Sequence, residues 1–318
     1  FMFNRGHWQK VEDFPMPDCQ PTVFPYGVIG DEHTYTSDWL TGKTIQILTE
    51  TDQPFFHMLS LPDPHDPAEV REPYASMYAP DDMELPATFE QENVPDWVTH
   101  WVPRVNHGKL TAADLRRRKA LWCGEVALID DCVGRILECL ERRGMLDNTI
   151  IVFTTDHGDY MGEHGLVAKN YLYQSVYHLP CLIRWPAGIR PGTVVQQLVD
   201  TVDFQQTILE LVGASASGRE QGRSAAPLVR GETIPDWDNT IFQHHSSHDA
   251  AGILTDRWHL IYVRHHQPAL FDRIEDPEEK TNRFGEEKTA DITRSLTETL
   301  LRHHEQVNSP AAAWLRKQ

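Results

Sequence analysis

The feature that most constrains this chain is a short apolar segment that ends abruptly in charged residues. Residues 149–155 are rich in β-branched side chains, which predicts a buried strand, and Asp156-His157-Gly158-Asp159 follows directly. A second apolar run, 179–185, comes after a loop that contains His164 and Lys169. In open α/β sheets the carboxyl ends of strands face the ligand crevice, because loops there carry polar groups without burying unpaired backbone. The sequence therefore predicts an α/β fold with a polar site at the end of this strand.

The composition narrows the class of partner. Of the 318 residues, 40% are hydrophobic, which is enough for a sizeable core. The 47 acidic residues exceed the 29 basic ones, and a net charge of −18 argues against nucleic acid or an anionic membrane surface as the main partner. No apolar run approaches the roughly 20 residues of a membrane-spanning helix. The five cysteines are scattered and odd in number, which favours a reducing, cytoplasmic compartment over a periplasmic or secreted one.

Hydrophobic periodicity predicts alternating helices and strands, followed by a smaller C-terminal part with a different pattern of short apolar runs. Ser37 or Asp38 is the expected N-cap of the first helix, and residues 68–110, rich in proline, are expected to form a long excursion without regular structure. We expect an α/β domain over 1–232, with a mixed or parallel sheet sandwiched by helices, and a small subdomain over 233–318 with an antiparallel sheet and a helix. Helices are predicted over 35–50, 111–144, 203–212 and 283–305, and strands over 55–61, 149–155, 179–185 and 194–199.

Four residues are candidates for chemistry, and each has a simpler alternative. The carboxylate of Asp156 and the imidazole of His157 can both turn toward one divalent ion, or Asp156 can cap the following turn while His157 packs. Lys169 lies in an apolar and aromatic sequence where a positive charge suits an anionic substrate, although most lysines are surface residues. His65 lies in a proline-stiffened loop after the other predicted strand, or is a loop histidine without a role. The histidine pairs lack spaced partners and are expected at the surface: 244–245, 265–266 and 303–304.

The order and spacing of several motifs resemble a known family. Thr154 to Asp159 is followed by Gly162-Glu163-His164-Gly165-Leu166, then by Lys169, and then by Leu179 to Pro186. This run resembles the later half of a type I sulfatase of the alkaline-phosphatase superfamily. Residues 35–47 resemble the helix that precedes the Pro-His segment in that family, and residues 55–67 resemble the Pro-His segment itself. Residues 270–272 and 276–282 resemble the family's closing signature. The resemblance covers nearly the whole chain and implies an alkaline-phosphatase-like fold.

The resemblance implies a sulfuric ester hydrolase that acts on small-molecule or carbohydrate sulfate esters. In that family a calcium ion, held by acidic side chains and an Asn or His, orients a formylglycine hydrate that attacks sulfur. Carried over by position, Asp156 and His157 are implied metal ligands, and His65 and Lys169 are implied contacts of the sulfate that assist the leaving alcohol. Ca²⁺ is the expected ion, while a histidine ligand is also compatible with Mn²⁺ or Zn²⁺.

The beginning of the chain departs from the family pattern. The formylglycine precursor, a Cys or Ser in Cys/Ser-x-Pro/Ala-x-Arg, is not found, because Cys19-Gln20-Pro21-Thr22-Val23 has valine in place of arginine. Two preceding metal-binding aspartates are also not found. We therefore expect a C-terminal portion of a sulfatase-like protein, with the formylglycine in the missing N-terminal part and no turnover by the isolated chain. Two alternatives stay open: a phosphodiesterase or phosphonate monoester hydrolase of the same superfamily, and a non-catalytic sulfatase-like module.

Overall fold

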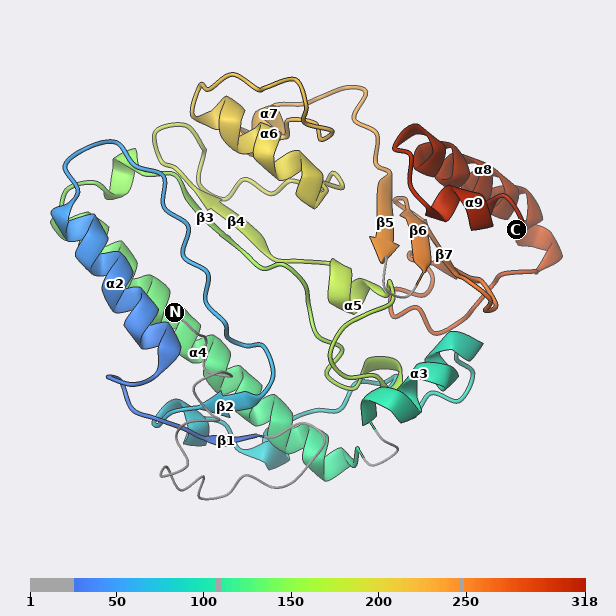
Figure 1. Cartoon of the computed structure of the whole chain (residues 1–318), viewed down its shortest axis with the longest axis horizontal. Coiled ribbons are helices and arrows are strands. Elements are labelled where there is room, and N and C mark those ends of the chain that lie inside the picture. Colours follow the sequence, from blue (N-terminus) through green and yellow to red (C-terminus); the bar gives the residue numbers. More distant parts are fainter. Residues whose placement is uncertain (1–25, 107–109, 246–248) are drawn as a thin grey trace. The chain divides into compact units, whose positions relative to one another are not determined.

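The computed structural model describes residues 26–106, 110–245 and 249–318, so the Cys19 segment lies outside the described residues. The chain divides into two compact units, Phe1–Pro86 with Arg104–Thr149, and Ala87–Pro103 with Ile150–Gln318 (Figure 1). This division does not fall at residue 232, and the subdomain boundary expected there stays a prediction. No helix in the described ranges has both the length and the apolar character needed to cross a bilayer.

The first unit is built on two helices that pack against each other. α2 (Thr36–Glu50) lies along α4 (Ala112–Arg142), and β1 (Tyr26–Val28) pairs in parallel with β2 (Ala68–Val70) beside α4 (Figure 1). Three 3₁₀ turns, Tyr74–Ser76, Pro80–Asp82 and Leu146–Asn148, complete the unit. Its core is formed by Tyr35, Ala68, Val70, Tyr74, Leu121, Leu128 and Cys132.

The sequence at both ends of α4 explains its limits and confirms the helix predicted over 111–144. The Thr111 side chain accepts a hydrogen bond from the Asp114 backbone nitrogen at 3.1 Å, and the Asp114 carboxylate accepts one from the Thr111 nitrogen at 3.2 Å. This reciprocal capping box satisfies two amide groups that a helix start leaves unpaired. Gly144, with φ 64°, adopts the left-handed conformation that ends many helices.

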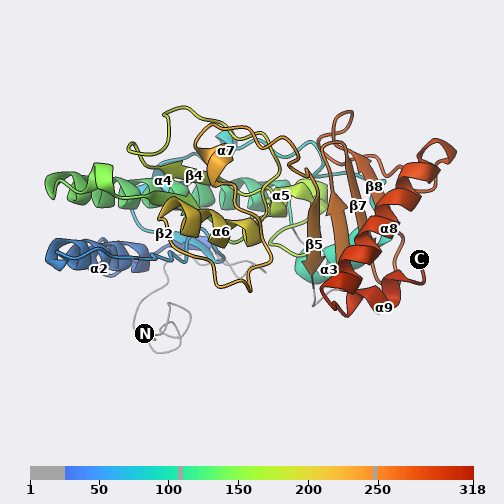
Figure 2. The ribbon, with the colours of Figure 1, turned by 90° about the horizontal axis from the view of Figure 1, so that it is seen from above.

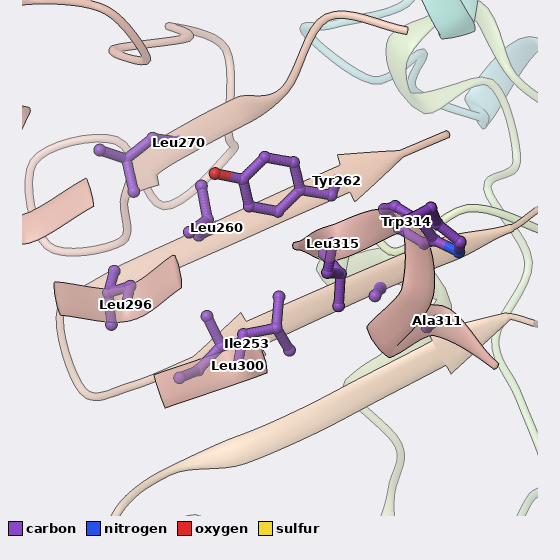
Figure 3. Packing of buried hydrophobic residues seen from close by; sticks show 10 residues of the cluster. Ile253, Leu260, Tyr262, Leu270, Leu296, Leu300, Ala311, Trp314 and Leu315 are labelled. Atoms are coloured by element: carbon purple, nitrogen blue, oxygen red, sulfur yellow. The ribbon is translucent and has the colours of Figure 1, made fainter. Parts of the chain in front are cut away.

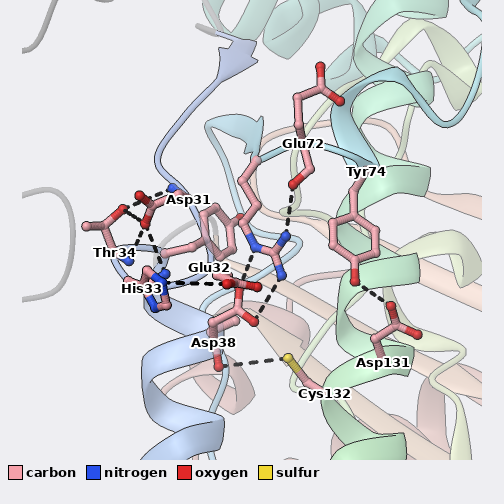
Figure 4. A network of polar contacts seen from close by, with 12 residues as sticks. Asp31, Glu32, His33, Thr34, Asp38, Glu72, Tyr74, Asp131 and Cys132 are labelled. Atoms are coloured by element: carbon pink, nitrogen blue, oxygen red, sulfur yellow. Dashed lines mark hydrogen bonds and ion pairs between the residues drawn. The ribbon is translucent and has the colours of Figure 1, made fainter.

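The predicted N-cap of α2 is wrong. The helix begins after Tyr35, which makes no side-chain cap hydrogen bond, and Ser37 and Asp38 are buried inside its first turn. The carboxylate of Asp38 accepts hydrogen bonds from Arg71 Nε at 2.7 Å and from Arg135 at 2.8 Å. Figure 4 shows Asp38 within its polar network. A buried carboxylate requires such partners, and two guanidinium groups satisfy it better than a single backbone amide.

Two predictions for the first hundred residues are also wrong. Residues 55–61 join no sheet among the described residues, and the side chains of Phe56 and Met58 are 85% and 76% exposed. An apolar run becomes a buried strand only when another strand lies beside it, and the pattern alone does not show its neighbours. The expected excursion over 68–110 contains β2 and α3 (Asp96–Asn106); Pro95 precedes α3, where a proline is compatible with a helix start.

The second unit begins with an antiparallel ribbon. β3 (Ile151–Thr154) pairs with β4 (Cys181–Arg184), which confirms the strands predicted over 149–155 and 179–185. Their predicted burial is wrong, since Phe153 and Leu182 are 36% and 66% exposed. Residues 194–199 form no strand, contrary to the prediction. α5 (Gln174–Tyr177) lies between β3 and β4 in the chain, and α6 (Thr201–Leu211) and α7 (Ala226–Val229) follow β4. α6 confirms the helix predicted over 203–212.

The C-terminal part of this unit is the expected antiparallel sheet with helices. The sheet runs in the order β5 (Ile241–His245), β6 (Ala250–Leu254), β7 (Trp258–Val263) and β8 (Ala269–Asp272). α8 (Ala290–Gln306) and α9 (Ala311–Leu315) lie on one of its faces (Figure 2). Figure 3 shows the apolar cluster between them, with Ile253, Leu260, Tyr262 and Leu270 from the strands and Leu296, Leu300, Ala311, Trp314 and Leu315 from the helices.

One histidine that was expected at the surface is buried. His304 is only 2% exposed, because it follows Leu296 and Leu300 at intervals of four residues on the inner face of α8. Burial, with smaller contributions from His244 and His303, lowers the pKa of His304 to about 4. The helical spacing was a visible signal that the histidine belongs to the core.

Candidate functional site

Asp156 and His157 follow β3, and their side chains converge. The His157 Nε2 atom lies 3.8 Å from the Asp156 Oδ1 atom, with the aspartate side chain 87% exposed and the histidine side chain 30% exposed. The His157 Nδ1 atom lies 2.9 Å from the carbonyl oxygen of Gly158. A carbonyl oxygen only accepts, so Nδ1 donates and the neutral ring keeps its lone pair on Nε2, the tautomer that a metal ligand requires.

The chemistry of this pair fits part of a metal site. Divalent cations bind carboxylate oxygen, and many also bind imidazole nitrogen. Two donors do not complete a coordination sphere, and the described parts of the chain contain no group of three or more His, Cys, Asp or Glu residues that could hold a metal ion. The Asp156 and His157 side chains alone would therefore fill only two positions around an ion, and the other ligands would have to come from other residues.

Gly158 fixes the backbone behind the pair. Its N–H donates to the carbonyl oxygen of Val176 in α5 at 2.8 Å. A Cβ atom at position 158 would lie 2.1 Å from the carbonyl oxygen of Ser175, a distance that no side chain tolerates. Only glycine therefore lets this segment approach α5 so closely. The contact with α5 in turn fixes the position of the His157 backbone.

The loop that carries Lys169 has an unusual backbone. Five of its residues other than glycine have positive φ angles: Met161, His164, Ala168, Asn170 and Tyr171. Left-handed backbone at such residues costs free energy and persists only where the surroundings impose it, and it concentrates at functional sites.

Tyr160 holds both sides of Lys169. The Tyr160 N–H donates to the Ala168 carbonyl oxygen at 2.9 Å, and its hydroxyl donates to the carbonyl oxygen of Asn170. The Tyr160 side chain is 1% exposed, whereas Lys169 is partly exposed. One buried residue thus fixes the carbonyl groups before and after the lysine, and with them the backbone from which its side chain extends.

His164, in the same loop, supports the structure rather than forming part of the Asp156 and His157 cluster. Its ring stacks on Tyr173 with centroids 3.8 Å apart and an interplanar angle of 9°. Its Nδ1 atom lies 3.0 Å from the Gln91 side-chain oxygen. Burial lowers the pKa of His164 to about 4, so the ring is neutral at pH 7. A neutral stacked ring helps to order the loop around Lys169.

His65 lies in the first unit, in a loop whose neighbouring carboxylates are held firmly. The His65 side chain is exposed, and its Nδ1 atom lies 2.9 Å from the carbonyl oxygen of Asp66. Asp63 accepts a hydrogen bond from the Tyr35 hydroxyl at 2.8 Å, and Asp66 forms an ion pair with Arg118 of α4. The loop is therefore anchored on both sides of the histidine.

The structure brings some of the predicted residues together. Asp156 and His157 are in contact, and Lys169 belongs to the same unit, whereas His65 belongs to the other unit. The sequence reasoning missed Tyr160 and Arg118, which anchor Lys169 and the His65 loop. The only local signal for Tyr160 is its position between the motifs at 154–159 and 162–166. Arg118 lies on the buried face of α4, and a charged residue is not normally expected there.

Comparison with solved structures defines the class of protein. The phosphonate monoester hydrolase of Agrobacterium radiobacter has a TM-score of 0.81 at 25% identity and covers 95% of this chain, which covers 67% of that one. A structure in complex with its substrate D-glucosamine-2-N,6-O-disulfate has a TM-score of 0.70 at 22% identity, over 87% of this chain and 71% of that one. The fold is that of the alkaline-phosphatase-like hydrolases: mixed α/β, with a C-terminal antiparallel sheet and helix.

The chain belongs to the sulfatase family, whose description, "Sulfatase", matches residues 4–214. The family "N-sulphoglucosamine sulphohydrolase, C-terminal" matches residues 162–306. An N-acetylglucosamine-6-O-sulfatase of Bacteroides thetaiotaomicron is 28% identical over 85% of this chain and 47% of its own length. An arylsulfatase of Clostridium perfringens is 27% identical over 96% of this chain and 65% of its own length. The chain thus spans about half to two thirds of these curated relatives.

Sulfatases generally use a divalent metal ion and a formylglycine. The Asp156 and His157 pair offers two donors of the right chemistry for the ion. The formylglycine motif matches no segment of this sequence, and the nearest one, at Cys19, lies outside the described residues.

Proposed function

We propose that the whole protein hydrolyses sulfate monoesters, with Asp156 and His157 as metal ligands and with His65 and Lys169 in contact with the sulfate. The observation that carries this proposal is the approach of the Asp156 carboxylate to the His157 ring, 3.8 Å apart at the end of β3. Membership of the sulfatase family supports the reaction type. The firmly held backbones around Lys169 and His65 support their roles, because a catalytic group acts well only when its position is fixed.

Each residue has a defined task in the proposed reaction. When bound, the divalent ion and the formylglycine would supply charge neutralisation and the attacking oxygen. The Lys169 ammonium group offsets negative charge on the sulfate oxygens as the bond between sulfur and the alcohol oxygen breaks. His65 or Lys169 gives a proton to that oxygen, so that a neutral alcohol leaves. Tyr160 and Arg118 do not touch the substrate and act through the backbones of Lys169 and the His65 loop.

We propose Ca²⁺ as the ion and a sulfated sugar as the substrate. Carboxylate oxygen is the preferred ligand of Ca²⁺, and the exposed Asp156 offers it, although His157 also suits Mn²⁺ or Zn²⁺. The relatives named as N-acetylglucosamine-6-sulfatases support a sugar as the alcohol half. Elemental analysis of the purified full-length protein tests the ion, and finding no stoichiometric divalent metal would favour a non-catalytic module.

The decisive experiment measures turnover of aryl and glucosamine sulfates by the full-length gene product and its variants. Asp156→Ala and Lys169→Ala are each expected to lower kcat by about 100-fold or more. Asp236→Ala and Lys317→Ala remove the same charges from exposed positions and are expected to leave turnover within about twofold. Undiminished activity in both site variants would refute the assignment.

A second candidate is hydrolysis of phosphonate monoesters or phosphodiesters. It is favoured by the likeness to the phosphonate monoester hydrolase of Agrobacterium radiobacter, with a TM-score of 0.81 over 95% of this chain. The two functions differ in the measured ratio of kcat/KM for a phenyl phosphonate ester and for the matching aryl sulfate. A ratio far above one would replace the sulfatase proposal with this one.

A further inference from the structure

A buried carboxylate lies far along the chain from the candidate metal ligands. Glu279, in the turn that follows β8, is 2% exposed, and its own backbone has a φ of 53°, which is uncommon for a residue other than glycine. The conformation is held by a hydrogen bond from the Glu279 N–H to the Asp276 carbonyl oxygen at 3.0 Å. A strained backbone at a buried charged residue indicates that the position of its side chain matters.

The C-terminal sheet holds one side of this carboxylate. The Nδ1 atom of His259, a fully buried residue of β7, lies 2.5 Å from Glu279 Oε1, and its Nε2 atom lies 2.7 Å from the side-chain oxygen of Gln243 in β5. Gly252 of β6 makes room, because a Cβ atom there would lie 2.9 Å from that Gln243 oxygen. Burial raises the pKa of Glu279, but the charge and hydrogen bond of His259 and the donors of Gln174 outweigh it and lower the pKa. Glu279 is therefore ionised at neutral pH.

The other side of the carboxylate holds the start of α5. Glu279 Oε2 accepts a hydrogen bond from the backbone nitrogen of Gln174 at 3.0 Å, and Oε1 lies 3.3 Å from the Gln174 side-chain nitrogen. Gln174 is the first residue of α5, a helix of a single turn that has little stability of its own. Two residues further on, the Val176 carbonyl oxygen accepts the Gly158 N–H at 2.8 Å.

We propose that Glu279 is a positioning residue for Asp156 and His157: held by His259, its carboxylate fixes the first turn of α5, and α5 fixes Gly158 and the two residues before it. The relevance to catalysis rests on the proposed function, but the mechanical connection does not. Residues that support metal ligands without touching the ion commonly change metal affinity by about 10-fold to 100-fold when they are lost.

The first test compares Glu279→Ala with Asp272→Ala in the full-length protein. Asp272 is a matched control, because it is 1% exposed and its carboxylate binds Arg257 and the backbone nitrogens of Ile274 and Glu275 instead of α5. Native-state hydrogen exchange is measured at the Gly158 amide, with each rate corrected for the variant's global stability. We expect exchange at least about 10-fold faster in Glu279→Ala than in Asp272→Ala. Calorimetric titration with Ca²⁺ is expected to show about 10-fold to 100-fold weaker binding in the first variant only.

A second pair of variants removes the proposed contact itself and serves if Glu279→Ala does not fold. Gln174→Pro deletes the backbone N–H that Glu279 binds, at the first helical position, where proline is tolerated. Tyr173, with ψ 150°, already has the extended backbone that precedes a proline. Gln174→Ala loses the same side chain but keeps the N–H. We expect fast Gly158 exchange in the proline variant and near-parent exchange in the alanine variant.

The outcomes separate this inference from the proposed function. Equal Gly158 exchange in Glu279→Ala and Asp272→Ala, or in the two Gln174 variants, overturns the positioning role. Faster exchange with no sulfate ester turnover by the parent protein keeps the mechanical connection and refutes the sulfatase assignment.

Discussion

Arg118 on α4 forms a buried ion pair with Asp66, the residue that follows His65; the two side chains are 3% and 17% exposed. Removing one partner of a buried pair leaves the other charge uncompensated. We therefore expect Arg118→Met to lower the free energy of unfolding by about 3–5 kcal/mol, measured by denaturant titration. Arg142→Met breaks an exposed pair with Glu138 and is expected to cost at most about 0.5 kcal/mol. Similar losses in both variants would contradict the structural role of Arg118.

Tyr160→Phe tests whether the position of Lys169 matters for catalysis. The change deletes only the hydroxyl that donates to the Asn170 carbonyl oxygen, so the expected loss of stability is about 1 kcal/mol. Because Lys169 then loses one of its two anchors, kcat for a sulfate ester is expected to fall about 10-fold to 100-fold. Tyr262→Phe removes a comparable hydroxyl, 2.8 Å from Thr297 in the C-terminal part, and serves as control. An equal effect on kcat in the two variants would show that the Tyr160 hydroxyl has no special role in positioning Lys169.

Gly158→Ala is expected to be strongly destabilising. The added Cβ atom meets the Ser175 carbonyl oxygen at 2.1 Å, so α5 or the residues before Gly158 must move, at a cost of about 1–3 kcal/mol. Gly134→Ala is the matched change in α4, where no described atom outside the local helix backbone lies within 4 Å of the new methyl group. That variant is expected to gain about 0.5–1 kcal/mol, because alanine favours a helix interior. Thermal unfolding of both proteins shows whether the signs are opposite.

Acidification is expected to destabilise the second unit. Burial lowers the pKa values of His164 and His304 to about 4 in the folded chain, from an ordinary value of 6.5. Between these values the unfolded chain binds protons that the folded chain does not, so stability is full above pH 6.5 and falls as the pH drops toward 4. Each histidine contributes a slope of at most about 1.4 kcal/mol per pH unit.

The histidine contribution is measured by comparing unfolding at several pH values in the parent and in His304→Leu. The variant is expected to show a shallower loss of stability on acidification, because one of the imidazoles whose pKa is lowered by burial is gone. His178→Gln, a change at an exposed histidine, is expected to follow the parent curve. A parent-like slope in His304→Leu would show that His304 protonates without cost.

Local patterns predicted the elements whose determinants lie close together in the sequence. The capping box of Thr111 and Asp114, the periodic apolar residues behind it and the left-handed Gly144 are all readable along one segment. The C-terminal strands were equally clear, because each is short and ends in a tight turn. Burial was not predictable in the same way: β3 and residues 55–61 look apolar, and only the presence or absence of neighbouring strands decides whether they are covered.

The candidate site shows the same limit. Asp156 and His157 are adjacent in the sequence, so their approach was expected. Arg118 and Asp66 are far apart along the chain, as are Glu279 and Gln174, and no periodicity links the members of either pair. Such contacts are properties of the tertiary structure, and a single sequence carries no trace of them.

The left-handed residues around Lys169 restrict how this protein can change. β-Branched side chains are strongly disfavoured at positive φ, so valine, isoleucine and threonine are poor replacements at Met161, His164, Ala168, Asn170 and Tyr171. Random mutagenesis followed by selection for a new substrate should therefore accumulate few accepted changes in this loop. New specificity will have to arise in segments whose backbone leaves a wider choice of amino acids.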